Sequence, residues 1–126
     1  MEVVKRFSFD AAHFLPGYEG KCVNMHGHHW VVDIGVRGPV DKDSGMILDF
    51  TLLKKLADPV IDEMDHSIVN NIIKNPTAEN ICIYILDRLI ERIANHDVSM
   101  GDSSKTPYLS FIRVWETEDS YAELRL

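Results

Sequence analysis

The chain has 126 residues, of which 45% are hydrophobic and 26% are charged, and its formal net charge is −7. A chain of this length can bury a core without disulfide bonds, and its two cysteines are too few and too far apart for a secreted disulfide framework. The acidic balance argues against non-specific nucleic-acid binding and no stretch is apolar enough to span a membrane, so we expect one domain, 1–126, in the cytoplasm.

Two strands are predicted in the first third of the chain, because apolar and polar residues alternate over 1–12 and again over 26–37. Side chains two positions apart on a strand share a face. One face of the first strand carries Phe7, Phe9, Ala11 and, by extension, His13. One face of the second carries His26, His28, Trp30, Val32, Ile34 and Val36. Histidines are therefore expected among apolar neighbours on both strands.

Helical spacing replaces this alternation in the middle of the chain. Apolar residues recur every three or four positions over 50–64, and Asp49 or Thr51 can cap the start of that helix. A second helix is predicted to begin at Thr77 and to continue to about Asn95. Its apolar residues surround much of its girth, so we expect it to be covered on more than one side.

The last third is predicted to contain a polar loop, 96–107, and two strands, 108–117 and 121–126, joined by the tight turn TEDS. The order β-β-α-α-β-β is typical of an α+β domain with an antiparallel four-stranded sheet and two helices packed on one face. Such a sheet has two exposed edges, which joining sheets between subunits into a closed barrel would cover. We therefore expect a homo-oligomer.

Histidine is crowded toward one end of the chain, which holds four of its six histidines between positions 13 and 29. His13, His26 and His28 fall on inward strand positions, where a buried imidazole needs a partner. A metal ion is one such partner, since three strand imidazoles can hold Zn²⁺ with the fourth position open, as in catalytic sites. Ordinary histidines with hydrogen-bond partners are the alternative. His29 is expected on the opposite face, toward solvent or an interface, and His96 has no predicted role.

The two cysteines lead to different predictions. Cys22 lies in a glycine-rich loop beside Lys21, and a nearby ammonium or metal favours the thiolate that acts as a base or nucleophile. A fourth zinc ligand and a small apolar loop residue are the alternatives. Cys82 falls within the second predicted helix, where a buried and inert thiol is expected.

Four further residues carry polar groups that need a partner. Asp65 and His66 follow the first helix, either as a proton relay or as a C-terminal cap that complements the helix dipole. Glu116 ends an apolar strand face, where a flat ligand with paired N–H groups or a salt bridge at the rim would satisfy its carboxylate. Thr77 opens the second helix as an anion or amide site, or as a plain N-cap.

Six segments follow one another along the chain: FSFDAAHFL, KCVNMHGHHW, GMILDFTLLKK, MDHSIVN, NPTAEN and VWETEDSYAE. In that order they resemble the 6-pyruvoyltetrahydropterin synthase and 6-carboxytetrahydropterin synthase family of tunnelling-fold enzymes, nearly from end to end. The short spacing between Cys22 and His26, together with NPTAE, resembles the carboxy-forming branch of queuosine biosynthesis.

The resemblance implies a zinc enzyme acting on 7,8-dihydroneopterin triphosphate. His13, His26 and His28 would hold Zn²⁺, and the substrate's side-chain hydroxyls would enter its open position. Cys22 would be the general base, and Lys21 is the nearest candidate for a phosphate contact. In the carboxy-forming branch, triphosphate and acetaldehyde leave and 6-carboxytetrahydropterin remains.

The resemblance also assigns the remaining candidates. Asp65 and His66 would form a supporting relay, and Glu116 would anchor the amino and ring N–H edge of the pterin. Thr77 and Glu79 would lie against the same ring. Family members are hexamers of two stacked trimers with active sites between subunits, so the relay and the zinc would come from different chains.

Four alternatives stay open at this point. The pyruvoyl-forming branch would eliminate triphosphate and keep the side chain. An aldolase would cleave the side chain to a hydroxymethyl pterin, although such relatives tend to carry Glu in place of Cys22. A non-catalytic zinc-binding module would use Cys22 as a fourth ligand. A zinc hydratase or hydrolase would suit the three histidines but leaves the order of the later motifs unexplained.

Overall fold

The computed structural model describes residues 1–100 and 105–126 and confirms the α+β order expected from the sequence. Each long element lies within two residues of its predicted bounds. These elements are β1 (Glu2–His13), β2 (His26–Arg37), α1 (Phe50–Met64), α2 (Ala78–Ile93), β5 (Tyr108–Thr117) and β6 (Ser120–Arg125).

The four long strands form an antiparallel sheet in the order β1-β2-β5-β6. The expectation of a purely antiparallel, four-stranded sheet was wrong, because two short strands add parallel pairs. β3 (Ser67–Ile68) lies beside β1, and β4 (Ser99–Met100) lies beside β5. Each has only two residues, too few to show an alternation, and β4 falls in the stretch predicted as a loop. Positions 101–104 of that loop lie outside the described residues.

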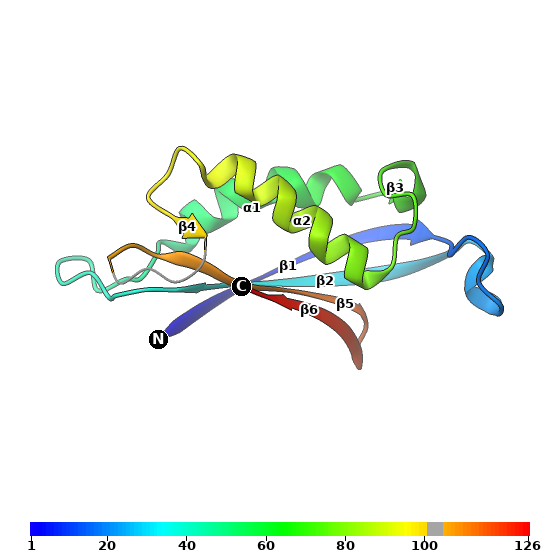
Figure 1. The fold of residues 1–126 in the computed structure, drawn as a ribbon, viewed down its shortest axis with the longest axis horizontal. Helices are drawn as coiled ribbons and strands as arrows, with labels where there is room; N and C mark the ends of the chain where they lie inside the picture. The colour runs from blue at the N-terminus through cyan, green and yellow to red at the C-terminus, as the bar shows by residue number, and fades with distance from the viewer. Residues whose placement is uncertain (101–104) are drawn as a thin grey trace.

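Both long helices cover the same face of the sheet, and the opposite face is bare in the single chain (Figure 1). The alternation predicted for β2 is confirmed on the covered face, where Trp30, Val32, Ile34 and Val36 are fully buried. Leu53, Leu56, Val60, Ile61, Ile81, Ile85 and Leu89 meet them from the helices. No helix within 1–100 and 105–126 is long and apolar enough to cross a membrane.

Side-chain caps start both helices where the sequence places them. The Asp49 carboxylate accepts a hydrogen bond from the Thr51 N–H at 2.8 Å, so Asp49 is the cap of α1. The Thr77 hydroxyl accepts from the Asn80 N–H at 3.2 Å and caps α2. Both caps satisfy N–H groups that have no partner inside their helix.

Pro59 lies inside α1 and leaves the carbonyl of Lys55 without its usual helical donor, because proline has no N–H. Arg92 of α2 compensates: its Nη2 donates to the Lys55 carbonyl at 3.4 Å and its Nε donates to the Leu56 carbonyl at 2.7 Å. One guanidinium therefore joins the two helices at the point where the proline interrupts α1.

Arg92→Gln is expected to lower the free energy of unfolding by about 1 kcal/mol, since the variant loses hydrogen bonds from a charged donor at a partly exposed site. Urea unfolding followed by circular dichroism measures the change. Arg92→Lys, which keeps the charge but not the two-point geometry, is expected to recover only part of it. A glutamine variant as stable as the parent would contradict this role.

Candidate metal centre

The β1–β2 hairpin brings three histidines together on the face of the sheet that the helices cover. The register pairs His13 directly with His26, and His28 lies two residues further along β2. Ring centroids are 4.7 Å apart for His13 and His26, 4.8 Å for His26 and His28, and 5.2 Å for His13 and His28. Trp30 lies edge-on to the His13 ring at 4.9 Å and separates the cluster from the rest of the core.

Two backbone carbonyls determine which ring nitrogens carry protons. Nδ1 of His13 donates to the Pro76 carbonyl at 2.8 Å, and Nδ1 of His26 donates to the Asn24 carbonyl at 2.8 Å. A carbonyl oxygen only accepts, so in the neutral rings the proton lies on Nδ1 and both Nε2 atoms present lone pairs. These two Nε2 atoms lie 3.1 Å apart. Two lone pairs repel at that distance unless a cation or proton lies between them, so the pair suits a metal ion oriented by outer carbonyls.

His28 supplies an unsatisfied nitrogen to the same cluster. Its Nε2 is buried and makes no hydrogen bond to any described residue. Burial lowers the pKa of His28, and the nearby Glu116 carboxylate offsets this only in part. The imidazole is therefore held neutral with a free lone pair, which is the form that binds a metal.

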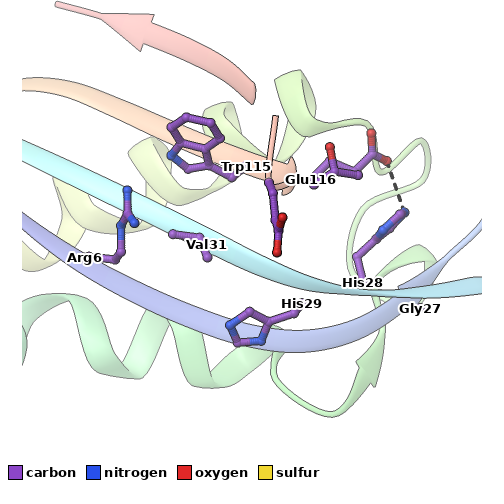
Figure 2. A pocket seen from close by; sticks show the side chains of 9 residues that line it. Arg6, Gly27, His28, His29, Val31, Trp115 and Glu116 are labelled. Carbon is purple, nitrogen blue, oxygen red and sulfur yellow. Dashed lines mark ion pairs between the residues drawn. The ribbon is translucent and has the colours of Figure 1, made fainter. Parts of the chain in front are cut away.

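Glu116 of β5 completes the cluster. Its Oε1 lies 3.2 Å from His13 Nε2 and 3.5 Å from His28 Nε2, and the four donor atoms all lie within 4.8 Å of one another. Figure 2 shows the pairing of Glu116 with His28. Tetrahedral bonds of about 2.0 to 2.1 Å separate neighbouring ligand atoms by about 3.3 to 3.4 Å. The three imidazoles and the carboxylate can therefore hold a metal ion, and a carboxylate lies where an open position was expected.

Two cavities meet at Glu116. Thr77, Glu79 and Glu116 line one of about 330 Å³ at the start of α2, so the structure brings these three sequence-predicted residues together. The other, of about 510 Å³, lies where the pairing of β2 with β5 ends, beyond Val31 and Trp115, and is lined by Gly27, His28, His29 and Glu116 (Figure 2).

Cys22 lies on a short 3-10 turn, Lys21–Val23, and is half-buried. Its carbonyl accepts a hydrogen bond from the Leu15 N–H at 2.7 Å, and Leu15 lines the smaller cavity. The thiol is not one of the four clustered donors, and Lys21 is exposed on the same turn. Cys82 differs: it is buried in α2, and burial raises the pKa of its thiol to about 11, which agrees with an inert thiol.

Asp65 and His66 form a dyad at the end of α1. Asp65 Oδ2 lies 2.8 Å from His66 Nδ1, and Asp65 Oδ1 accepts from the Asp10 N–H at 3.0 Å. The helix ends at the extended Asp65; His66 follows with a φ of 56°, a left-handed conformation, and its N–H donates to the Asp10 carbonyl at 2.7 Å. The His66 side chain is 81% exposed, so within one chain its imidazole faces solvent and not the histidine cluster.

We expect His66 to titrate above its ordinary value of 6.5, because the hydrogen bond and charge of Asp65 raise the pKa of the imidazole. The stabilisation from this imidazolium is present at low pH and is lost as pH rises through the folded-state pKa. Asp65→Asn is expected to return the pKa to about 6.5. Proton NMR of the histidine ring against pH measures both values, and an unchanged titration would contradict the pairing.

Sequence reasoning missed a second acid–histidine pair, on the bare face of the sheet. His29 lies on that face and is exposed, as predicted, and its Nδ1 lies 2.8 Å from Asp10 Oδ1. The two residues face each other directly in the β1–β2 register. Had the two predicted strands been aligned with His13 opposite His26, the same register would have placed Asp10 opposite His29.

The chain matches the protein family described as 6-pyruvoyl tetrahydropterin synthase over residues 2–126. A Pyrococcus furiosus protein named dihydroneopterin monophosphate aldolase is 40% identical over 122 residues, covering 97% of this chain and 95% of its own length. An Archaeoglobus fulgidus protein, named provisionally as a 6-carboxy-5,6,7,8-tetrahydropterin synthase, is 38% identical over 118 residues, covering 94% and 90%.

The fold is similar to a solved structure of a 6-pyruvoyl tetrahydropterin synthase from Caenorhabditis elegans. The TM-score is 0.83 at 28% sequence identity, and the match covers 100% of this chain and 95% of that chain. The likeness therefore extends over all the elements that surround the histidine cluster.

Proposed function

Since the chain belongs to the 6-pyruvoyl tetrahydropterin synthase family, we propose that it is a zinc-dependent 6-carboxytetrahydropterin synthase of the cytoplasm. It would convert 7,8-dihydroneopterin triphosphate and one water molecule to 6-carboxy-5,6,7,8-tetrahydropterin, acetaldehyde and triphosphate, a step in queuosine biosynthesis. The observation that carries the metal-dependent part is the cluster of three imidazoles and Glu116, in which His28 Nε2 is buried without a hydrogen bond to any described residue. The relative named as a carboxy-forming synthase supports the choice of branch.

In this proposal His13, His26 and His28 hold Zn²⁺, and the carbonyls of Pro76 and Asn24 orient two of the rings. Bound zinc would supply Lewis acidity to the oxygens of the substrate side chain. The Trp30 ring keeps the inner side of the cluster dry, because it packs against both His13 and His28.

The pterin ring would occupy the smaller cavity. Thr77 and Glu79 line that cavity at the start of α2, and the Glu116 carboxylate can accept the paired N–H groups of the pterin edge. Cys22, on the turn tethered to Leu15, would take protons from the substrate side chain as the general base. Lys21 on that turn would contact the triphosphate.

We further propose that the active site is completed by a neighbouring subunit, in a hexamer of two stacked trimers whose sheets close into barrels. The bare sheet face, its exposed edges and the outward His66 imidazole support this arrangement. The Asp65–His66 dyad of one chain would then relay protons in the site of another. His66→Asn is the appropriate variant for testing this relay, because asparagine tolerates the left-handed backbone that His66 adopts.

A dihydroneopterin aldolase is the second candidate, favoured by the 40% identity to the Pyrococcus furiosus protein. Both activities would break a bond in the substrate side chain, so the same metal cluster suits either. The presence of Cys22, where such aldolases tend to carry a glutamate, supports the synthase. A pyruvoyl-forming enzyme, which would also use a cysteine, differs in the product that it releases.

Product analysis with zinc-loaded protein and 7,8-dihydroneopterin triphosphate separates these functions. The carboxy-forming synthase yields 6-carboxytetrahydropterin with acetaldehyde, the pyruvoyl-forming enzyme yields the pyruvoyl pterin, and the aldolase yields a hydroxymethyl pterin. Cys22→Ala is expected to keep the metal and lose turnover. A variant that instead loses the metal, together with a parent that turns over no pterin, would overturn the enzyme proposal in favour of a zinc-binding module.

A further inference from the structure

Glu116 occupies a position that two different partners require. Its Oε1 lies within 3.5 Å of both His13 Nε2 and His28 Nε2, where a fourth metal ligand would lie. The same side chain lines the cavity of Thr77 and Glu79, where the pterin edge would need an acceptor. One carboxylate is thus shared between the metal cluster and the ligand cavity.

We propose that Glu116 is an exchangeable fourth ligand, which closes the metal site in the ligand-free protein and leaves it when a pterin enters. The proposal rests on the proposed function, because it takes the pterin as the ligand that draws the carboxylate away. Binding of the pterin ring and release of the fourth coordination position of the metal are then a single event. A substrate oxygen could reach the metal only after the ring is in place.

The charge of the cluster favours the closed state. The three imidazoles are neutral ligands, so a divalent ion among them keeps its full positive charge and attracts the nearest carboxylate. Glu116 is that carboxylate, and with 32% of its side chain exposed it is not locked in the core. Paired N–H donors of a pterin edge would offer the carboxylate two hydrogen bonds in exchange for one metal bond.

The end of β5 allows the side chain to move between its two partners. Pairing with β2 stops at Trp115, and the pairing with β6 shifts register between Trp115 and Thr117. Glu116 therefore lies at the irregular point of the strand, with a cavity on either side. A rotation of the side chain, with no movement of the helices, would carry the carboxylate from the cluster to the ring.

Metal affinity and the spectrum of bound Co²⁺ test this inference independently of turnover. Glu116→Gln is expected to bind zinc at least about 10-fold more weakly in competition with a chelator, and to shift the visible spectrum of bound Co²⁺. Glu118→Gln removes a carboxylate that lines the larger cavity outside the four-donor cluster, and should match the parent in both measurements.

The second part of the test adds 7,8-dihydroneopterin, which lacks the triphosphate, to the Co²⁺-loaded protein. This pterin should shift the Co²⁺ spectrum of the parent toward that of ligand-free Glu116→Gln. Equal zinc affinity and identical spectra for the parent and Glu116→Gln would overturn the exchange while leaving the proposed function intact. A weakened metal site and a pterin-induced shift, in a protein that makes no carboxypterin, would support the exchange and refute the proposed reaction.

Discussion

The His28→Ala protein is expected to lose pterin turnover by about 10³-fold or more and yet to remain folded. Loss of one of three imidazoles removes a metal ligand, and a metal ion contributes several kcal/mol of charge stabilisation in the transition state. His28 is the suitable ligand to remove, because it is only half-buried and its Nε2 has no hydrogen-bond partner among the described residues. His13 is fully buried, so its removal would also leave a cavity.

Thermal unfolding with and without zinc distinguishes lost metal from a damaged fold. At a zinc concentration about 100 times its dissociation constant, the parent should gain about 2.7 kcal/mol of stability, whereas His28→Ala should gain far less. Without metal, the two proteins are expected to agree within about 1 kcal/mol. His29→Ala is the matched control, since the neighbouring imidazole contacts Asp10 outside the cluster. Equal zinc responses of the parent and His28→Ala would refute the metal site.

The hairpin half of the site could be predicted from the sequence because a strand has a period of two. Alternation placed His13 and His28 on the same inward face as Phe9 and Trp30, and the structure buries that face. What alternation does not show is the register between strands. Asp10 faces His29 for the same reason that His13 faces His26, but the alternation within each strand does not show which residues face each other, and so it does not predict the Asp10–His29 pair.

The position of Glu116 next to the histidines depends on contacts between distant parts of the chain. The pairing of β2 with β5, and the point at which it ends, decide where the carboxylate lies. No local pattern contains that information, so the sequence predicted only that Glu116 needs a donor partner. The two-residue strands β3 and β4 were missed for a related reason, because their partners β1 and β5 define them and their own sequences do not.

Arg6→Met is expected to destabilise the protein by about 2 to 3 kcal/mol at neutral pH, because it leaves Asp33 as a buried carboxylate that has lost its cation. Arg6 donates to the two Asp33 oxygens at 2.8 and 3.0 Å, and Trp115 Nε1 donates to Asp33 at 2.9 Å. The Asp33 side chain is 6% exposed and that of Arg6 is 63% exposed. Solvent around the arginine screens the ion pair, so the loss of stability is smaller than it would be for a fully buried pair.

The pH dependence of stability that arises from Asp33 should weaken in Arg6→Met. Burial alone would raise the pKa of Asp33, but the hydrogen bonds from Arg6 and Trp115, together with the charges of Arg6 and Arg113, outweigh burial and hold the pKa below 3.8. The parent therefore gains stability from Asp33 above that value and loses it as pH falls. In Arg6→Met only the Trp115 hydrogen bond and the charge of Arg113 still oppose burial, so the gain in stability from Asp33 with rising pH should be smaller than in the parent. Urea unfolding from about pH 3 to about pH 7 measures the difference between the two slopes.

The double variant Arg6→Met with Asp33→Asn tests whether the unpaired charge is the cause. A neutral amide still accepts the Trp115 N–H and costs less to bury, so the double variant should recover most of the lost stability. A double variant no more stable than Arg6→Met would assign the loss to packing of the arginine, whose guanidinium lies 6.0 Å from the Trp115 ring. Because Trp115 immediately precedes Glu116, the Asp33 hydrogen bond also holds the last residue of β5 that pairs with β2 before the strand reaches the metal cluster.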